Sequence, residues 1–259
     1  MELKELRGAK GAPSWFGQVF FGRKDGFNSK LSATIAEIQP NWKVGIYTGD
    51  NLFTFGKNLS FLTDVKFMAA IAAHTETDVE RSTIWRAAVL CWAGRLGLRH
   101  PGDFVECGCY RGTSARVVYD VLSLHDHPDR QFWLYDLFDY PEGSRHTKMP
   151  GMGPELFEET RARFADLENV RVSKGSVPEV LTDNAPSRIA FLHIDMNNVK
   201  AEIGALDALF DRVEPGAPIV LDDYGYFGYV AQRDAERAWF AERGYDVLEL
   251  PTSQGLVIK

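Results

Sequence analysis

The chain has 259 residues, a formal net charge of -7 and a sequence pI of about 5.4, with 45% hydrophobic and 25% charged residues. This length suits one catalytic domain with an extension, and the composition is ordinary for a globular protein in water. An acidic chain without a Lys/Arg run is a poor partner for nucleic acid. The first residues lack the apolar core of a signal peptide, and no apolar run nears membrane-span length. We therefore expect a soluble, cytoplasmic protein without membrane contact.

The three cysteines, Cys91, Cys107 and Cys109, are too few for a disulfide framework, and their number is odd. Cys107 and Cys109 lie in an apolar strand and turn, and no neighbouring cluster of histidines or cysteines completes a zinc site. We expect all three to be reduced, buried thiols.

Residues 1–60 show no regular periodicity, so we expect irregular structure there. They are rich in aromatic side chains, which need burial and argue against disorder. These side chains could pack on the catalytic domain, on a second subunit or over a substrate. The aromatic residues of this segment include Trp15, Phe16, Phe20, Phe21, Phe27, Trp42, Tyr47, Phe53 and Phe55.

Residues 61–98 carry apolar side chains at helical spacing and predict two helices. Thr77 or Asp78 could cap the second helix, and Gly97 could end it. We expect these helices to lie against a sheet or to cover a cofactor. Residues 1–99 are thus predicted to form an N-terminal extension that acts as a lid or in dimerisation, and residues 100–259 the catalytic domain.

From Gly102 onward, strand and helix patterns alternate, which predicts an α/β fold with a mostly parallel sheet and helices on both faces. The last two strands, 245–251 and 255–259, are close in sequence, so one of them should run antiparallel. The other predicted strands are 103–107, 131–138, 170–173, 189–195 and 217–223, and the predicted helices are 112–124, 154–167, 199–213 and 230–244. An open parallel sheet binds ligands at the carboxyl ends of its strands.

Two motifs suit a nucleoside-bearing cofactor. In DFVECGCYRGTSA a strand ends at Glu106, glycines follow at Gly108 and Gly112, and a helix begins near Thr113. Glycine permits close approach of a ligand, and a helix N-terminus favours a carboxylate. Asp136 ends the next strand, where an acid could hold a ribose diol. The alternatives are a tight turn without a ligand and an acid that only caps a loop.

Three aspartates follow two further strands: Asp195 ends FLHID, and Asp222 and Asp223 end IVLDD. If these strands are neighbours, the carboxylates converge, and like charges at that spacing are costly unless a cation neutralises them. Mg²⁺ prefers such oxygen ligands. The alternative is that one aspartate caps a helix and another faces solvent.

DFVECGCYRG, FWLYDLFDYPEG, FLHID and IVLDDYG together resemble the macrocin O-methyltransferase family of bacterial natural-product sugar methyltransferases, over roughly residues 100–259. The resemblance implies a Rossmann-like class I methyltransferase sheet, S-adenosylmethionine and Mg²⁺ as cofactors, methylation of a small-molecule hydroxyl on a sugar or glycosylated natural product, and a homodimer. It places Asp195, Asp222 and Asp223 on the metal, Glu106 near the methionine end, Asp136 on the ribose, and Gly175 and Ser176 near the adenine. The full set of implied cofactor contacts is Glu106, Gly108, Tyr110, Gly112, Thr113, Ser114, Asp136, Phe138, Gly175, Ser176 and Asp195.

The chain departs from the family at Asn197, where members often have a second aspartate that is a candidate general base. A neutral amide is not a useful proton acceptor. The catalytic candidates are Asp195, Asn197 and His193, with His146 and Tyr224 as other substitutes for the base. Two alternatives stay open, a nicotinamide-dependent oxidoreductase and a catalytically weak cofactor-binding scaffold. The missing G-x-G-x-x-G motif argues against the first.

Overall fold

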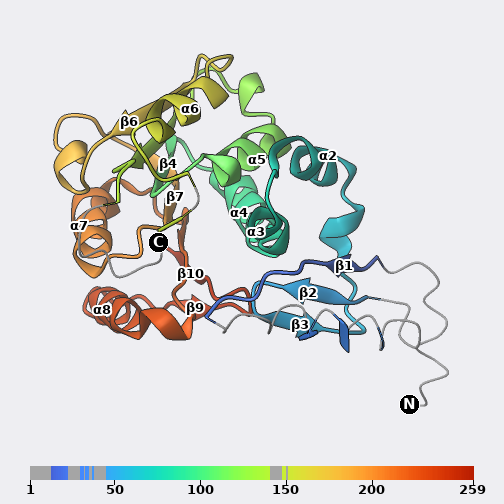
Figure 1. The fold of residues 1–259 in the computed structure, drawn as a ribbon. Helices are drawn as coiled ribbons and strands as arrows, with labels where there is room; N and C mark the ends of the chain where they lie inside the picture. The colour runs from blue at the N-terminus through green and yellow to red at the C-terminus, as the bar shows by residue number, and fades with distance from the viewer. Residues whose placement is uncertain are drawn as a thin grey trace. The chain divides into compact units, whose positions relative to one another are not determined.

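The computed structural model describes residues 13–22, 45–140, 148, 149 and 151–259, together with residues 30, 31, 33, 34 and 37 (Figure 1). The chain divides into two compact units, Met1–Ala88 and Val89–Lys259. The roles predicted for residues 1–99 and 100–259 concern function and stay predictions.

The first unit contains a three-stranded sheet of β1 (Trp15–Phe16), β2 (Tyr47–Gly49) and β3 (Leu52–Thr54). β1 pairs with β2 in parallel, and β2 pairs with β3 in antiparallel. Asp50 and Asn51 form the two-residue turn of this hairpin with φ values of 52° and 58°, which Asp and Asn tolerate better than most side chains. The expectation of irregular structure before residue 60 is therefore wrong for these segments, because strands of two or three residues are too short to show alternation.

The helices that follow are α2 (Val65–His74), α3 (Asp78–Ser82) and α4 (Ile84–Gly97), after the short 3-10 helix η3 (Ser60–Thr63). Thr77 caps α3 in a capping box, as its hydroxyl accepts from the N–H of Glu80 and the Glu80 carboxylate accepts from the N–H of Thr77. The predicted cap and the predicted end at Gly97 are confirmed. A single helix over this range is not, because Thr83 leaves helical geometry at ψ 13° and separates α3 from α4.

The second unit is built on a seven-stranded sheet with the order β6-β5-β4-β7-β8-β10-β9. Neighbours from β6 to β8 are parallel, whereas β10 runs antiparallel to both β8 and β9. This confirms the predicted parallel sheet and the antiparallel C-terminal strand. The strands are β4 (Asp103–Cys107), β5 (Phe132–Asp136), β6 (Val170–Lys174), β7 (Ile189–Ile194), β8 (Pro218–Leu221), β9 (Leu248–Glu249) and β10 (Gly255–Ile258).

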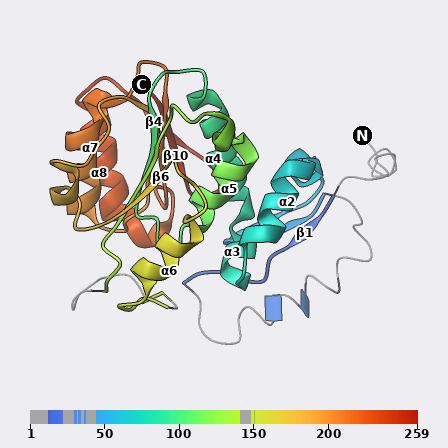
Figure 2. The same cartoon turned by 90° about the horizontal axis from the view of Figure 1, so that it is seen from above.

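Helices cover both faces of this sheet. Figures 1 and 2 show α7 and α8 on one face and α5, with the part of α4 from Val89 onward, on the other. The helices of this unit are α5 (Thr113–Leu122), α6 (Leu156–Arg163), α7 (Val199–Leu209) and α8 (Val230–Ala241), with 3-10 turns η4 (Leu124–Asp126), η5 (Glu179–Leu181), η6 (Phe210–Arg212) and η7 (Phe227–Tyr229).

Both faces of the sheet are packed with apolar side chains. Every residue of β7 is buried, and its Leu192 and Ile194 share a core with Leu206 of α7 and Phe240 of α8. Burying each such side chain stabilises the fold by about 1.5–3 kcal/mol. On the other face, a Cβ at Gly94 of α4 would lie 3.4 Å from the ring of Phe104 in β4, and one at Gly97 would lie 2.6 Å from the carbonyl oxygen of Ala190 in β7. The predicted packing of a helix from this region against the sheet is thus confirmed for α4.

The three cysteines are buried free thiols, as predicted. None of the helices in the described part of the chain combines the length and apolar character that a membrane crossing requires.

Candidate functional site

Four strained residues mark one edge of the large sheet. Tyr110, Phe138, Asn197 and Asp223 have φ values of 48°, 48°, 54° and 54° and follow β4, β5, β7 and β8. These four strands are adjacent in the sheet. A non-glycine residue in the left-handed region costs on the order of 1–3 kcal/mol, and such residues gather at functional sites. The strain therefore points to the carboxyl edge of β5-β4-β7-β8, where a ligand was expected.

The loop after β4 depends on glycine for two different reasons. Gly108 has a φ of 91°, and a Cβ there would lie 1.8 Å from the carbonyl oxygen of Asp195, so no side chain fits between these two loops. Gly112 is the N-cap of α5 and has no side chain to accept from the first N–H groups of the helix. A helix N-terminus without a side-chain cap suits an anion.

Asp136 ties three loops together. Its Oδ2 accepts the N–H of Tyr110 at 2.7 Å, and its Oδ1 accepts the N–H of Phe138 at 2.7 Å. Its backbone carbonyl accepts the N–H of Gly175 at 3.0 Å, which places the Gly175–Ser176 turn beside the end of β5. The role of Asp136 in holding a ribose stays a prediction.

Glu106, His193 and Asp222 form a buried chain of polar groups behind this edge. Glu106 Oε1 lies 3.1 Å from His193 Nδ1 and accepts from Ser114 Oγ at 3.2 Å, and His193 Nε2 lies 3.9 Å from Asp222 Oδ1. Burial alone lowers the pKa of His193, but the neighbouring carboxylates of Asp222 and Glu106 outweigh it and raise the pKa to about 10. With an exposure of 2%, His193 is buried between two acids, a poor position for a base that must reach a substrate. Its catalytic role stays a prediction.

Asp195, Asp222 and Asp223 lie together as the sequence suggested. Each offers a carboxylate oxygen, and these oxygens lie within 4.8 Å of one another. Their strands β7 and β8 are parallel neighbours, which is why the two loops meet. A hard divalent cation fits three such oxygens and offsets their repulsion. Their role as metal ligands stays a prediction.

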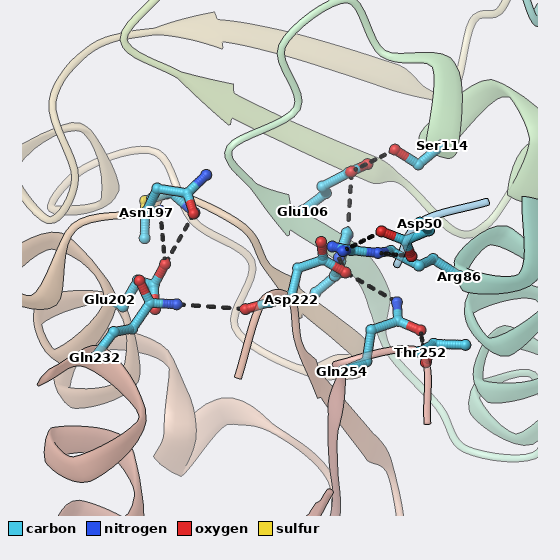
Figure 3. A network of polar contacts seen from close by, with 12 residues as sticks. Asp50, Arg86, Glu106, Ser114, Asn197, Glu202, Asp222, Gln232, Thr252 and Gln254 are labelled. Atoms are coloured by element: carbon cyan, nitrogen blue, oxygen red, sulfur yellow. Dashed lines mark hydrogen bonds and ion pairs between the residues drawn. The ribbon is translucent and has the colours of Figure 1, made fainter. Parts of the chain in front are cut away.

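Asp222 is held from the C-terminal hairpin and from α8. Its Oδ1 accepts the amide Nε2 of Gln254 at 3.0 Å, and Gln254 Oε1 accepts the hydroxyl of Thr252 at 2.9 Å. Its backbone carbonyl accepts Gln232 Nε2 at 3.3 Å (Figure 3). Sequence reasoning missed Gln232, Thr252 and Gln254, because no local motif marks a residue that contacts a site across the sheet.

Asn197 and the residue before it are held by α7. The N–H groups of Met196 and Asn197 donate to Glu202 Oε1 at 3.0 and 2.9 Å, and Figure 3 shows Glu202 directed at Asn197. The only available sequence signal for Glu202 was an acid inside the apolar face of a helix. Tyr224, another candidate base, is 3% exposed, and His146 lies outside the described residues.

Residues 97–239, more than half of the chain, match the family model for macrocin-O-methyltransferases (TylF). The chain belongs to the macrocin-O-methyltransferase family. The match includes every predicted site residue from Glu106 to Asp223, and it leaves out Thr252 and Gln254.

Two curated relatives are O-methyltransferases of Streptomyces species. The chain is 28% identical over 167 residues to demethyldecarbamoylnovobiocin O-methyltransferase of Streptomyces niveus, which covers 59% of this chain and 63% of the relative. It is 27% identical over 139 residues to 8-demethyl-8-(2,3-dimethoxy-alpha-L-rhamnosyl)-tetracenomycin-C 4'-O-methyltransferase of Streptomyces olivaceus, covering 48% and 53%. The chain thus spans between half and two thirds of the length of these relatives.

Solved structures establish the fold of this macrocin-O-methyltransferase family member. The O-methyltransferase NovP superposes with a TM-score of 0.58 at 21% identity, covering 72% of this chain and 82% of that one. A calicheamicin methyltransferase superposes with a TM-score of 0.59 at 14% identity, covering 92% and 95%. The predicted class I methyltransferase fold is confirmed.

Proposed function

We propose that this protein transfers a methyl group from S-adenosylmethionine to a hydroxyl of a small molecule, a sugar or a sugar-bearing natural product. The observation that carries the proposal is the convergence of Asp195, Asp222 and Asp223 beside the glycine-dependent loop after β4. Family membership supports methyl transfer, and the names of the curated relatives support a sugar-bearing acceptor.

The cofactor would lie along the ends of β4, β5 and β6. The uncapped N-terminus of α5 would receive its carboxylate, Asp136 its ribose hydroxyls, and Gly175 and Ser176 would lie at its adenine. Glu106 is buried against His193 and Ser114, so we assign it to shaping this pocket. The cofactor supplies an electrophilic methyl group on a sulfonium.

The metal would be held by Asp195, Asp222 and Asp223, and the three carboxylates fit Mg²⁺ by their chemistry and spacing. When bound, the cation supplies Lewis-acid polarisation of an acceptor oxygen and fixes its orientation. Asp222 is kept in place by Gln254 and Gln232, so the position of this carboxylate is fixed before any ligand arrives.

In the reaction, an acceptor oxygen forms a bond to the methyl carbon while the carbon–sulfur bond breaks, S-adenosylhomocysteine is released as the thioether, and the hydroxyl proton passes to solvent. Asn197 is an amide, and His193 is buried between two acids. Burial, followed by the charges of Asp223 and Asp195, raises the pKa of Tyr229 to about 12. These neighbours of Asp195 are thus not bases at neutral pH, and we expect turnover to increase as the pH rises and the acceptor itself ionises.

The test is methyl transfer from S-adenosylmethionine to a panel of rhamnosides and other sugars, with and without chelator. We expect chelator to abolish turnover and Mg²⁺ to restore it. Asp222→Asn should lower kcat at least about tenfold and leave the cofactor Kd, from calorimetric titration, nearly unchanged. Asp211→Asn, an exposed aspartate of η6, is the matched control.

Full turnover in chelator would remove the metal from the mechanism. Cofactor binding without methylation of any acceptor would instead favour the scaffold alternative, which is suggested by Asn197 in place of an acid. Binding of a nicotinamide nucleotide in place of S-adenosylmethionine would favour the oxidoreductase.

A further inference from the structure

Two glutamates meet between α7 and α8, beneath the loops that carry the three aspartates. Glu202 of α7 is 1% exposed and Glu236 of α8 is 0% exposed. The charge of Glu236 is one of the causes that raise the pKa of Glu202, so the two carboxyl groups lie close together. Burying two acids side by side is costly unless they are neutralised and hydrogen-bonded. The free-energy cost of burying them must therefore be offset by a gain elsewhere.

One shared proton accounts for the pair. Among the described residues, no N–H or O–H group donates to Glu202 Oε2 or to either oxygen of Glu236, and two carboxyl groups can bond only if one is protonated. Burial, followed by the charge of Glu236, raises the pKa of Glu202 well above its usual range. Burial raises the pKa of Glu236 to about 7. Glu202 Oε1 accepts two N–H groups, so the shared proton lies among the other three carboxyl oxygens of the pair.

The pair reaches the site by two routes. Glu202 holds the N–H groups of Met196 and Asn197, directly after Asp195. One helical turn before Glu236, Gln232 donates to the backbone carbonyl of Asp222. Residues four apart on a helix lie on the same face, so α8 presents Gln232 and Glu236 together. Figure 3 shows Gln232 directed at Asp222 and Glu202 at Asn197.

We infer that Glu202, Glu236 and Gln232 form a support cluster that positions the loops after β7 and β8, and with them Asp195 and Asp222, at the spacing a divalent cation requires. The members are positioning residues and contact no reacting atom. The metal part of this inference rests on the proposed function, whereas the fixing of the loop after β7 does not. Asn197, held in the left-handed conformation, has its N–H bound by this cluster.

The test compares Glu202→Leu with Glu202→Gln. Leucine removes the acceptor for both N–H groups. Glutamine keeps an oxygen for them, and its amide can donate to an ionised Glu236. In Glu202→Leu we expect the amide hydrogens of Met196 and Asn197, followed by NMR, to exchange at least tenfold faster than in the wild type. Mn²⁺ affinity, measured by calorimetry without an acceptor, should fall at least tenfold, while S-adenosylmethionine affinity stays within threefold.

Glu202→Gln should restore both readouts to within about threefold of the wild type, a result that a general loss of packing does not predict. Gln232→Met is a milder second variant that removes only the donor to Asp222, and it should weaken Mn²⁺ binding without changing exchange at Met196. Glu242→Gln, at the exposed C-terminus of α8, is the matched control and should change nothing.

Unchanged amide exchange in Glu202→Leu would overturn the inference, as would a Glu202→Gln protein as impaired as the leucine variant. If Glu202→Leu does not fold, unchanged Mn²⁺ affinity in Gln232→Met would overturn it. If the wild type binds no Mn²⁺, the metal part of the proposed function fails, and the amide exchange still decides whether Glu202 fixes the loop.

Discussion

Single residues at the strand ends both face the candidate site and fix the backbone of the neighbouring loops, and the sequence alone does not separate these two roles. Asp136 was predicted from its place at a strand end, and the structure adds that both its oxygens hold backbone N–H groups of neighbouring loops. Asn197 was identified as a departure from the family, yet its left-handed φ of 54° is visible only in three dimensions. Asparagine tolerates that conformation, but the sequence does not show that the loop requires it at this position.

Asp136→Asn should weaken S-adenosylmethionine binding by about 1–3 kcal/mol, the cost of losing a charged acceptor in a partly buried site. Its thermal midpoint should also fall, since one of the two backbone N–H groups meets a poorer partner. Calorimetric titration and thermal unfolding measure the two effects. Asp139→Asn, an exposed aspartate on the same loop, should leave both unchanged. Wild-type affinity in a folded Asp136→Asn protein would reject the ribose assignment.

Whole elements were predictable wherever periodicity had room to show. The strand–helix alternation after Gly102 predicted β4 to β8 in the right places, because each strand has four to six residues. β1, β2 and β3 have two or three residues each, too few for a period-two signal. The adjacent Asp50 and Asn51 are typical of a hairpin turn, and they were the one signal for β2 and β3 in the sequence. Contacts across the sheet, such as Gln254 to Asp222, depend on strand order and could not be read locally.

At this scale, α7 offers a test through its N-cap. The Asn198 side chain accepts the N–H of Ala201 at 3.1 Å, and Asn198 directly follows the loop of Asp195 and Asn197. Asn198→Ala should lower the free energy of unfolding by about 1 kcal/mol, the usual value of such a cap. Asn198→Ser keeps a capping oxygen and should retain most of the stability. Urea unfolding measures the free energy of unfolding of the two variants. Equal decreases in both would show that the capping hydrogen bond does not stabilise the start of the helix.

At the scale of the whole molecule, acidic groups gather at the edge that carries the candidate site and in the buried pair of Glu202 and Glu236. Glu236 faces Glu202 of α7 and Tyr224 of the loop after β8. The pKa of a free glutamic acid is about 4.3, and that of Glu236 is raised to about 7. The folded state therefore binds the proton more tightly than the unfolded state. This contribution to stability is full below the unfolded pKa and is lost as the pH rises through the folded one.

Glu236→Gln removes the titrating group and keeps a donor for Glu202. Relative to the variant, the wild type should lose stability steadily as the pH is raised from 5 to 8, as followed by urea midpoints. The exposed Glu242→Gln variant should run parallel to the wild type. Parallel curves for Glu236→Gln as well would mean that the pair does not take up a proton in this range.

We also expect a homodimer in which residues before 60 take part. Tyr47 and Phe20 are buried, whereas Phe53 and Phe55 are 45% and 52% exposed, an amount of aromatic surface that a partner would cover. Light scattering at micromolar concentration should give twice the chain mass, and Phe55→Ser should lower it. Leu248→Ser, exposed on β9, is the control. A stable wild-type monomer would contradict this expectation.

The order of the strands along the chain has a practical consequence for recombination. The residues assigned to the nucleoside end precede residue 180, and the three aspartates follow residue 190, so one crossover near η5 would exchange the acceptor half of the protein with that of a relative. The seam runs along the paired strands β4 and β7, and it includes the contacts of His193 with Glu106 and of the Asp195 carbonyl with Gly108. Chimeras that keep an acid, a histidine and a glycine at these places should remain compatible, and those that lose the glycine should not assemble.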